Sequence, residues 1–130
     1  MKIEVLKKID AVIFDCDGVL IDITKSYDST IIKTTQYVLK HFAQINDAID
    51  VDFKIIDGFK STGGFNDEVD LTYAAIISII ATRKLKKDQT QFIFDVIKNS
   101  DSSGIVSVEK YIQSLVDISD IKKQLSYQEF

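Results

Sequence analysis

The feature that most constrains the fold is one strand-like run followed by a long stretch with helical patterning only. Ala11–Phe14 is a short apolar run rich in β-branched and aromatic residues, which is typical of a strand buried on both faces of a parallel sheet. Such a strand needs neighbouring strands, because its backbone donors and acceptors cannot pair within one strand. We therefore predict a mostly α-helical chain whose one strand either belongs to an incomplete sheet or pairs with a partner chain.

The rest of the chain repeats apolar residues at helical spacing. The pattern predicts helices over 26–45 and 66–86, and further helices from about 88, 107 and 120. We expect Ser26 to cap the first helix and Asn66 to cap the second. The second contains YAAIISIIA, which is apolar almost all round, so it should lie at the centre of a helical bundle. We divide the chain into a strand with its loop over 1–22 and a helical domain over 23–130.

Composition excludes several classes of partner. The net charge is −4 and the basic residues are scattered, which does not favour nucleic-acid binding. The longest apolar stretch, around 74–81, is too short to span a bilayer, so no membrane partner is expected. Cys16 is the only cysteine, so no disulfide can form within the chain, and a reducing cytoplasm is the expected location.

Two carboxylates follow the strand-like run directly. In VIFDCDGVLID, Asp15 and Asp17 stand at the carboxyl end of the predicted strand, where open α/β sheets bind their ligands. Gly18 allows a sharp turn and a close approach of the backbone to an anion. One carboxylate can attack while its neighbour moves a proton, and Mg²⁺ would neutralise both and attract a phosphate.

The stretch FDCDGVLID resembles the first motif of the haloacid dehalogenase superfamily of phosphatases and related hydrolases. The resemblance implies that Asp15 is the nucleophile that forms an aspartyl-phosphate. It also implies that Ala11–Phe14 is the first strand of a Rossmann-like α/β core that this chain leaves incomplete. Asp17 would be the general acid/base, its backbone carbonyl would bind Mg²⁺ together with Asp15, and the substrate would be a small phosphorylated metabolite. A plain acidic strand-to-turn junction is the structural alternative. A calcium-binding EF-hand loop fits poorly, because it needs its glycine at the sixth position and here the glycine is fourth.

A second stretch, IDGFKSTGGFNDEVDLTY at Ile56–Tyr73, resembles the specificity loop in the helical cap of phosphoglycolate-phosphatase-like members of this superfamily. The resemblance makes Lys60 a candidate contact for phosphate or substrate, and Asn66 a weaker one. It also implies that Gly63 and Gly64 let the loop pack close to substrate. The alternative is a turn with a solvated lysine and a helix cap.

The superfamily also needs a Ser or Thr after a second strand, a Lys or Arg, and a further acidic pair. Ala75–Lys84, an apolar run that includes Thr82, could be the second motif of an enzyme without a cap, but the acidic turn after Asn66 favours a helix. The resemblance then implies the N-terminal part of a Mg²⁺-dependent phosphatase, inactive alone because motifs two to four are absent. The alternative is a non-catalytic helical binding or assembly module. In both cases we expect a homodimer, or a second chain that completes the core.

Overall fold

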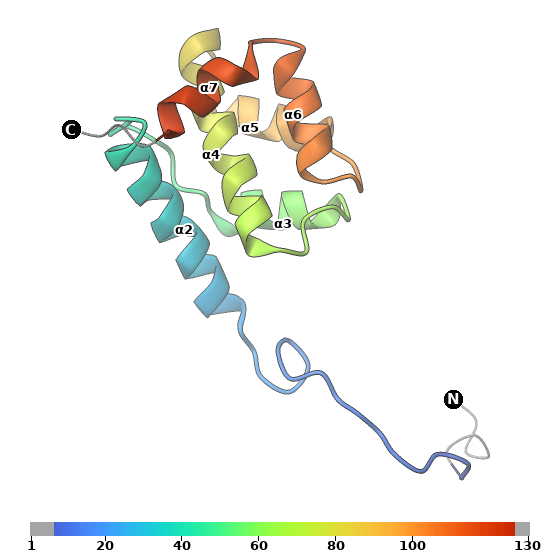
Figure 1. Cartoon of the computed structure of the whole chain (residues 1–130). Helices are drawn as coiled ribbons and strands as arrows, with labels where there is room; N and C mark the ends of the chain where they lie inside the picture. The colour runs from blue at the N-terminus through green and yellow to red at the C-terminus, as the bar shows by residue number, and fades with distance from the viewer. Residues whose placement is uncertain (1–6, 127–130) are drawn as a thin grey trace.

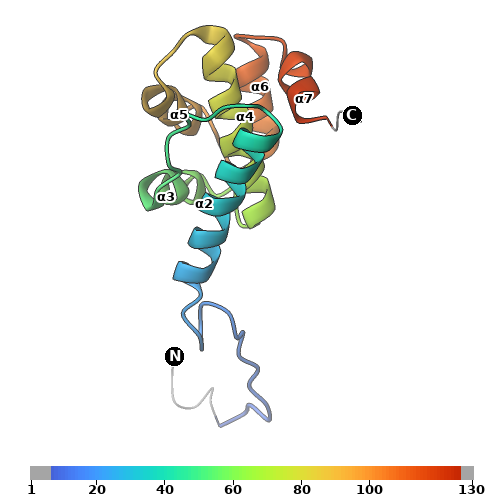
Figure 2. The same ribbon diagram turned by 90° about the vertical axis from the view of Figure 1, so that its left-hand side faces the viewer.

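The computed structural model describes residues 7–126, and its regular structure there is helical. An extended segment leads into the first helix and projects away from the bundle that the helices form (Figures 1 and 2). The prediction of a mostly α-helical chain is confirmed for these residues. The helices are α2 (Thr24–His41), α3 (Phe53–Ser61), α4 (Glu68–Leu85), α5 (Gln89–Lys98), α6 (Ile105–Gln113) and α7 (Ile118–Leu125).

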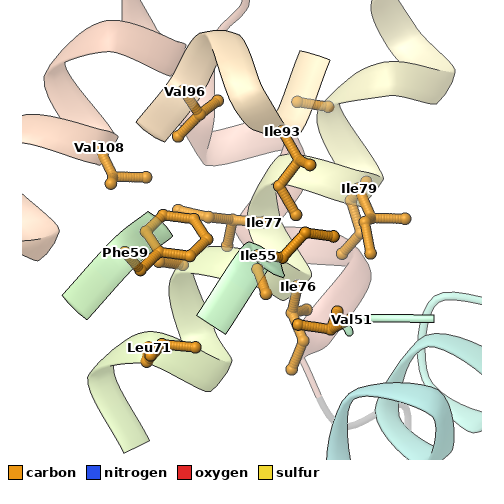
Figure 3. Packing of buried hydrophobic residues seen from close by; sticks show 14 of the residues in the cluster. Val51, Ile55, Phe59, Leu71, Ile76, Ile77, Ile79, Ile93, Val96 and Val108 are labelled. Carbon is orange, nitrogen blue, oxygen red and sulfur yellow. The ribbon is translucent and has the colours of Figure 1, made fainter. Parts of the chain in front are cut away.

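Helix α4 is the centre of the bundle, as its uniformly apolar sequence predicts. It packs against each of the other helices, and its side chains from Ala74 to Thr82 are all buried. Figure 3 shows Ile76, Ile77 and Ile79 of α4 packed among side chains that include Ile55 of α3 and Ile93 of α5. Burial of each such side chain contributes about 1.5–3 kcal/mol to folding.

The same helix excludes the reading of Ala75–Lys84 as a second core strand. These residues lie inside α4, and the Thr82 hydroxyl donates to the Ile79 carbonyl oxygen at 2.6 Å. Thr82 is buried in the bundle and its hydroxyl is used within its own helix. It is therefore not placed to hold a phosphate.

Two helix starts differ from the sequence prediction. Helix α2 begins at Thr24 with Ile23 at the cap position, so Ser26 lies inside the helix and does not cap it. Helix α4 is capped by Asp67 and not by Asn66: the Asp67 carboxylate accepts from the Val69 N–H at 2.7 Å. An aspartate is favoured there because its charge also complements the positive end of the helix dipole.

Helix α3 was not predicted from the sequence, where its residues were assigned to the start of a loop. The Asp52 carboxylate caps it by accepting from the Ile55 N–H at 3.1 Å. Ile55, Ile56 and Phe59 are buried on one face, and Phe59 meets Phe65 edge to face with 5.0 Å between ring centroids. The helix thus anchors both ends of the loop that leads to α4.

The predicted N-terminal strand is not present in the described residues. Ala11–Phe14 is exposed, with Ile13 at 95% of its full accessible area, and the backbone forms no sheet. The β-type pairing in residues 7–126 is one isolated bridge, between Asp17 and Ile21. The prediction of a buried strand is therefore wrong for this structure, because no other part of residues 7–126 forms a strand beside the run to complete a ladder. Among the described helices, none is both long and apolar enough to cross a membrane.

Candidate functional site: the acidic loop and its surroundings

The two aspartates flank a tight loop that glycine makes possible. The Gly18 N–H donates to the Ile21 carbonyl oxygen at 2.8 Å, and the N–H groups of Leu20 and Ile21 donate to the Cys16 carbonyl oxygen at 2.9 and 3.1 Å. Gly18 has φ +75°, a conformation that strains any residue with a Cβ. The loop therefore closes on itself, and the Gly18 N–H is used inside it.

Asp15 and Asp17 are both exposed, and one hydrogen bond ties their loop to the helical bundle. The Tyr27 hydroxyl, in the first turn of α2, donates to Asp17 Oδ2 at 3.4 Å. Because a tyrosinate would lie beside this carboxylate, Asp17 raises the pKa of Tyr27. Tyr27 is a contact that the sequence prediction missed. Its only signal was its place in the first helical turn after the motif.

Asp22 closes the segment at its junction with α2. Its carboxylate accepts from the Thr24 N–H at 3.0 Å, and this hydrogen bond lowers the pKa of Asp22. Asp22 thus satisfies a free N–H at the start of the helix, where Ile23 at the cap position has no side chain able to do so. This gives Asp22 a structural role at the hinge between segment and bundle.

The candidate substrate contacts of the second stretch lie on α3 and on the loop after it. Lys60 is exposed in the last turn of α3, and its carbonyl oxygen accepts from the Gly63 N–H at 3.1 Å. Asn66 is exposed next to the cap of α4. Within the described chain, no ion pair joins Lys60 to either motif aspartate. Helix α3 and the start of α4, between which this loop runs, lie toward the end of the bundle from which the N-terminal segment leaves (Figure 1).

The loop after α3 is held in place by a backbone contact with the loop after α5. A Cβ built on Gly64 would lie 2.5 Å from both the Asp101 carbonyl oxygen and the Gly104 nitrogen. A Cβ on Gly104 would likewise collide with the Gly64 carbonyl oxygen, and Gly104 has φ +63°. Gly104 is a residue whose importance the sequence did not indicate, because a glycine in NSDSSG reads as an ordinary turn.

The donor atoms of the acidic loop fit Mg²⁺ in kind. The Asp15 carboxylate and the Asp17 backbone carbonyl are hard oxygen ligands, which Mg²⁺ prefers, and Mg²⁺ ordinarily keeps several water ligands. No third carboxylate, histidine or cysteine of residues 7–126 joins them in a metal-binding cluster. The pair therefore offers part of a coordination shell.

Comparisons of the chain with protein-family models, curated proteins and solved structures find no match. The functional interpretation therefore depends on the residues described above.

Proposed function

We propose that this chain is the N-terminal part of a Mg²⁺-dependent phosphatase of the haloacid dehalogenase superfamily, with a helical cap over 23–130. The observation that carries the proposal is the Asp15–Cys16–Asp17–Gly18 motif, set on a tight glycine turn between an apolar run and a helical bundle. The composition of Ala11–Phe14, directly before the motif, supports it, since an apolar run rich in β-branched and aromatic residues is typical of a core strand of a parallel sheet.

In the proposed reaction a carboxylate oxygen of Asp15 attacks the phosphorus atom of a phosphomonoester. The bond from phosphorus to the ester oxygen breaks, and Asp17 donates its proton to the leaving alcohol. Asp17, now a carboxylate, takes a proton from water as the water oxygen attacks the aspartyl-phosphate. Phosphate leaves and Asp15 is regenerated as a carboxylate. Bound Mg²⁺ would supply neutralisation of the negative charge on the phosphate and on the two aspartates.

Lys60 and Asn66 complete the proposal as contacts for the substrate from the cap. Lys60 would neutralise phosphate charge, and Asn66 would accept from or donate to the leaving group. The part of Gly18 is to form the turn, because its N–H is used within the loop. The 130 residues contain no recognisable equivalent of the Lys or Arg, or of the further acidic pair, that the superfamily needs. Loss of each such group typically costs about 100-fold or more in rate, so turnover by this chain alone should be very slow.

A second candidate is a helical binding or assembly module that retains the aspartate motif without catalysis. The observation that favours it is the exposure of the apolar residues on both sides of the acidic loop, which are Val12, Ile13, Phe14, Val19, Leu20 and Ile21. Such a segment would be covered by a partner whether or not the aspartates react. The two candidates differ in what Asp15 binds.

Beryllium fluoride with Mg²⁺ separates the two candidates. Beryllium fluoride binds an aspartate nucleophile as a mimic of its phosphorylated form, so a new fluorine resonance should appear with the wild-type chain and disappear in Asp15→Asn. Asp10→Asn is the matched control, because Asp10 is an exposed carboxylate of the same segment outside the motif. The absence of any adduct at saturating beryllium fluoride would favour the assembly module. Hydrolysis of an aryl phosphate that survives Asp15→Asn would show that Asp15 is not the nucleophile.

A further inference from the structure

An apolar groove of about 410 Å³ runs along the bundle between α2 and α4 and reaches the end of α7. Its walls include Ile31 and Val38 from α2, Phe42 directly after α2, Val69 and Ile76 from α4, and Leu125 from α7. Phe42 and Val69 are themselves exposed, so the groove is open to solvent. Its volume is in the range of small-molecule sites in proteins.

Three of the five polar residues described along the groove donate their hydroxyl hydrogens within the protein. The Thr30 hydroxyl donates to the Ser26 carbonyl oxygen at 2.9 Å, and the Thr72 hydroxyl donates to the Glu68 carbonyl oxygen at 2.6 Å. The Tyr73 hydroxyl donates to Glu109 Oε1 at 2.7 Å. The Thr34 hydroxyl and the Glu68 carboxylate are the other polar groups of the described lining, so a ligand rich in hydroxyl groups would find few partners to replace its hydrogen bonds to water.

The groove begins close to the acidic loop. Tyr27, Ile31, Thr34 and Val38 are spaced by four, three and four residues and therefore share one face of α2. Tyr27 is thus one helical turn before the groove, and its hydroxyl contacts the Asp17 carboxylate. Glu68, which lines the groove, lies near enough to Tyr27 to act on it electrostatically together with Asp17. The groove and the aspartate motif are therefore neighbours along α2.

We infer that the groove binds the apolar part of the substrate, which is the phosphomonoester of an alkyl or aryl alcohol whose phosphate lies at Asp15 and Asp17. This inference rests on the proposed function and specifies its substrate class. Charge fits this orientation, because Glu68, the one carboxylate among the described residues of the groove wall, would repel a phosphate from the groove, while Mg²⁺ held at Asp15 and Asp17 would attract it to the acidic loop. The leaving alcohol then lies along α2, with its oxygen toward Asp17.

A series of n-alkylphosphonates tests this inference without turnover. Binding to the full chain in the presence of Mg²⁺ is measured by calorimetry, and the methyl resonances of Ile31, Val38 and Ile76 are followed by NMR. We expect the affinity to rise about fourfold with each methylene until the groove is full, because each buried methylene adds a constant transfer free energy. The three methyl resonances should shift with the longer ligands.

Variants that fill the groove provide the decisive comparison. Thr34→Trp and Val69→Trp each add a large side chain at an exposed position of the groove wall, so the bundle should keep its helical circular dichroism. Both variants should abolish the dependence of binding affinity on the alkyl length of the phosphonate. Val106→Trp is the matched control, since Val106 is an exposed valine of α6 outside the groove, and it should leave the dependence unchanged.

Three outcomes would overturn the inference. The first is an affinity that does not change with the alkyl length of the phosphonate. The second is a length dependence that persists in both filled variants. The third is self-association of the wild-type protein that excludes ligand and disappears in Thr34→Trp. The last outcome would assign the groove to a second copy of the chain. A failure of the proposed function alone would give a different result. The matching n-alcohols would then bind with the same affinity and the same length dependence as the phosphonates. Neither Mg²⁺ nor Asp15→Asn would change the binding.

Discussion

Gly64 and Gly104 are the residues at which two loops of the bundle touch through their backbones. We expect Gly64→Ala to lower the free energy of unfolding by up to about 3 kcal/mol. The new Cβ would lie 2.5 Å from the Asp101 carbonyl oxygen and the Gly104 nitrogen, and these backbone atoms can move only together with the rest of their loop. Urea denaturation measures this loss. Amide resonances should shift in both loops, 62–67 and 99–104, since each loop must give way to the other.

The neighbouring glycine provides the control. Gly63 has φ +80°, but a Cβ there would meet only Ser102 Cβ, at 4.0 Å. Gly63→Ala should therefore cost about 1–2 kcal/mol from backbone strain, and resonance shifts should stay within its own loop. If Gly64→Ala leaves the 99–104 resonances in place, the two loops do not touch as described.

Tyr73, Glu109 and Lys122 form a hydrogen-bonded cluster that links α4, α6 and α7. Glu109 Oε1 accepts from the Tyr73 hydroxyl at 2.7 Å and from Lys122 Nζ at 2.9 Å. Burial and the contact with Glu109 raise the pKa of Tyr73 to about 12, from 10.0. The unfolded chain thus loses this proton first as pH rises. Stability should be unaffected by Tyr73 ionisation below about pH 10 and should fall between pH 10 and 12.

Tyr73→Phe tests this cluster. The variant should lose about 1 kcal/mol of stability at pH 7 with the hydrogen bond, and its stability should decline less steeply than that of the wild type from pH 10 to 12. Part of the decline should remain, because Glu109 also raises the pKa of Lys122. Urea midpoints at pH 7, 10 and 11 provide the measurement, with the exposed Tyr37→Phe as control. If stability declines equally steeply with pH in Tyr73→Phe and in the wild type, the raised pKa is not that of Tyr73.

At the residue scale, the sequence indicates what is local and misses what the fold brings together. Asp15, Asp17 and Gly18 are adjacent, so a motif can specify both their chemistry and their turn. The contact of Gly64 with Gly104 joins segments that are far apart in the chain, and no local pattern encodes it. The Asp17–Tyr27 hydrogen bond depends on where α2 begins, which the sequence placed two residues too late.

The starts of the helices are set mainly by aspartates. Asp52, Asp67, Asp88 and Asp117 each accept from a backbone N–H two or three residues further on. Asp52 and Asp117 were not assigned as caps from the sequence, although both follow the same pattern. Helix α3 was therefore assigned to a loop although its cap and its buried face follow the usual pattern.

Asp67→Ala tests the corrected cap of α4. The variant should lower the free energy of unfolding by about 1 kcal/mol, because two N–H groups at the start of the central helix, those of Val69 and Asp70, lose their acceptor. Chemical denaturation followed by circular dichroism measures the loss. Asn66→Ala is the matched control and should change stability by less than about 0.5 kcal/mol, as expected for an exposed site outside the cap. The opposite ranking of the two variants would restore Asn66 as the cap.

At the scale of the whole molecule, two parts of the chain differ in how far sequence determines structure. Periodicity and caps are local signals, so they suffice to predict most of the helices of the bundle, but they do not specify the packing of α2 against α4, which are separated in the chain by α3. The apolar run before Asp15 has strand composition, but a strand exists only with a neighbour. Composition predicted what this segment would do inside a sheet, and the described chain supplies no sheet.

The exposed segment leads to a prediction about association. Val12, Ile13 and Phe14 expose 65%, 95% and 65% of their areas beside unpaired backbone donors and acceptors, which is the surface that pairs strand to strand with another chain. The simplest closed arrangement is a two-fold dimer in which the same segment of each copy pairs with the other. We therefore expect the apparent mass in light scattering to fall from dimer to monomer on dilution.

Two aspartate substitutions separate pairing through this segment from association through any exposed valine or isoleucine. Ile13→Asp places a charge in the middle of the proposed pairing edge and should weaken the dimer by at least about tenfold, since a buried, unpaired carboxylate costs more than about 1.4 kcal/mol. Val106→Asp places the same charge on the exposed face of α6 and should leave dilution behaviour unchanged. Helical circular dichroism should be equal in both variants, because neither residue is buried in the bundle. A wild-type chain that is monomeric at every concentration would contradict the dimer, and equal weakening by both substitutions would show that the segment does not form its interface.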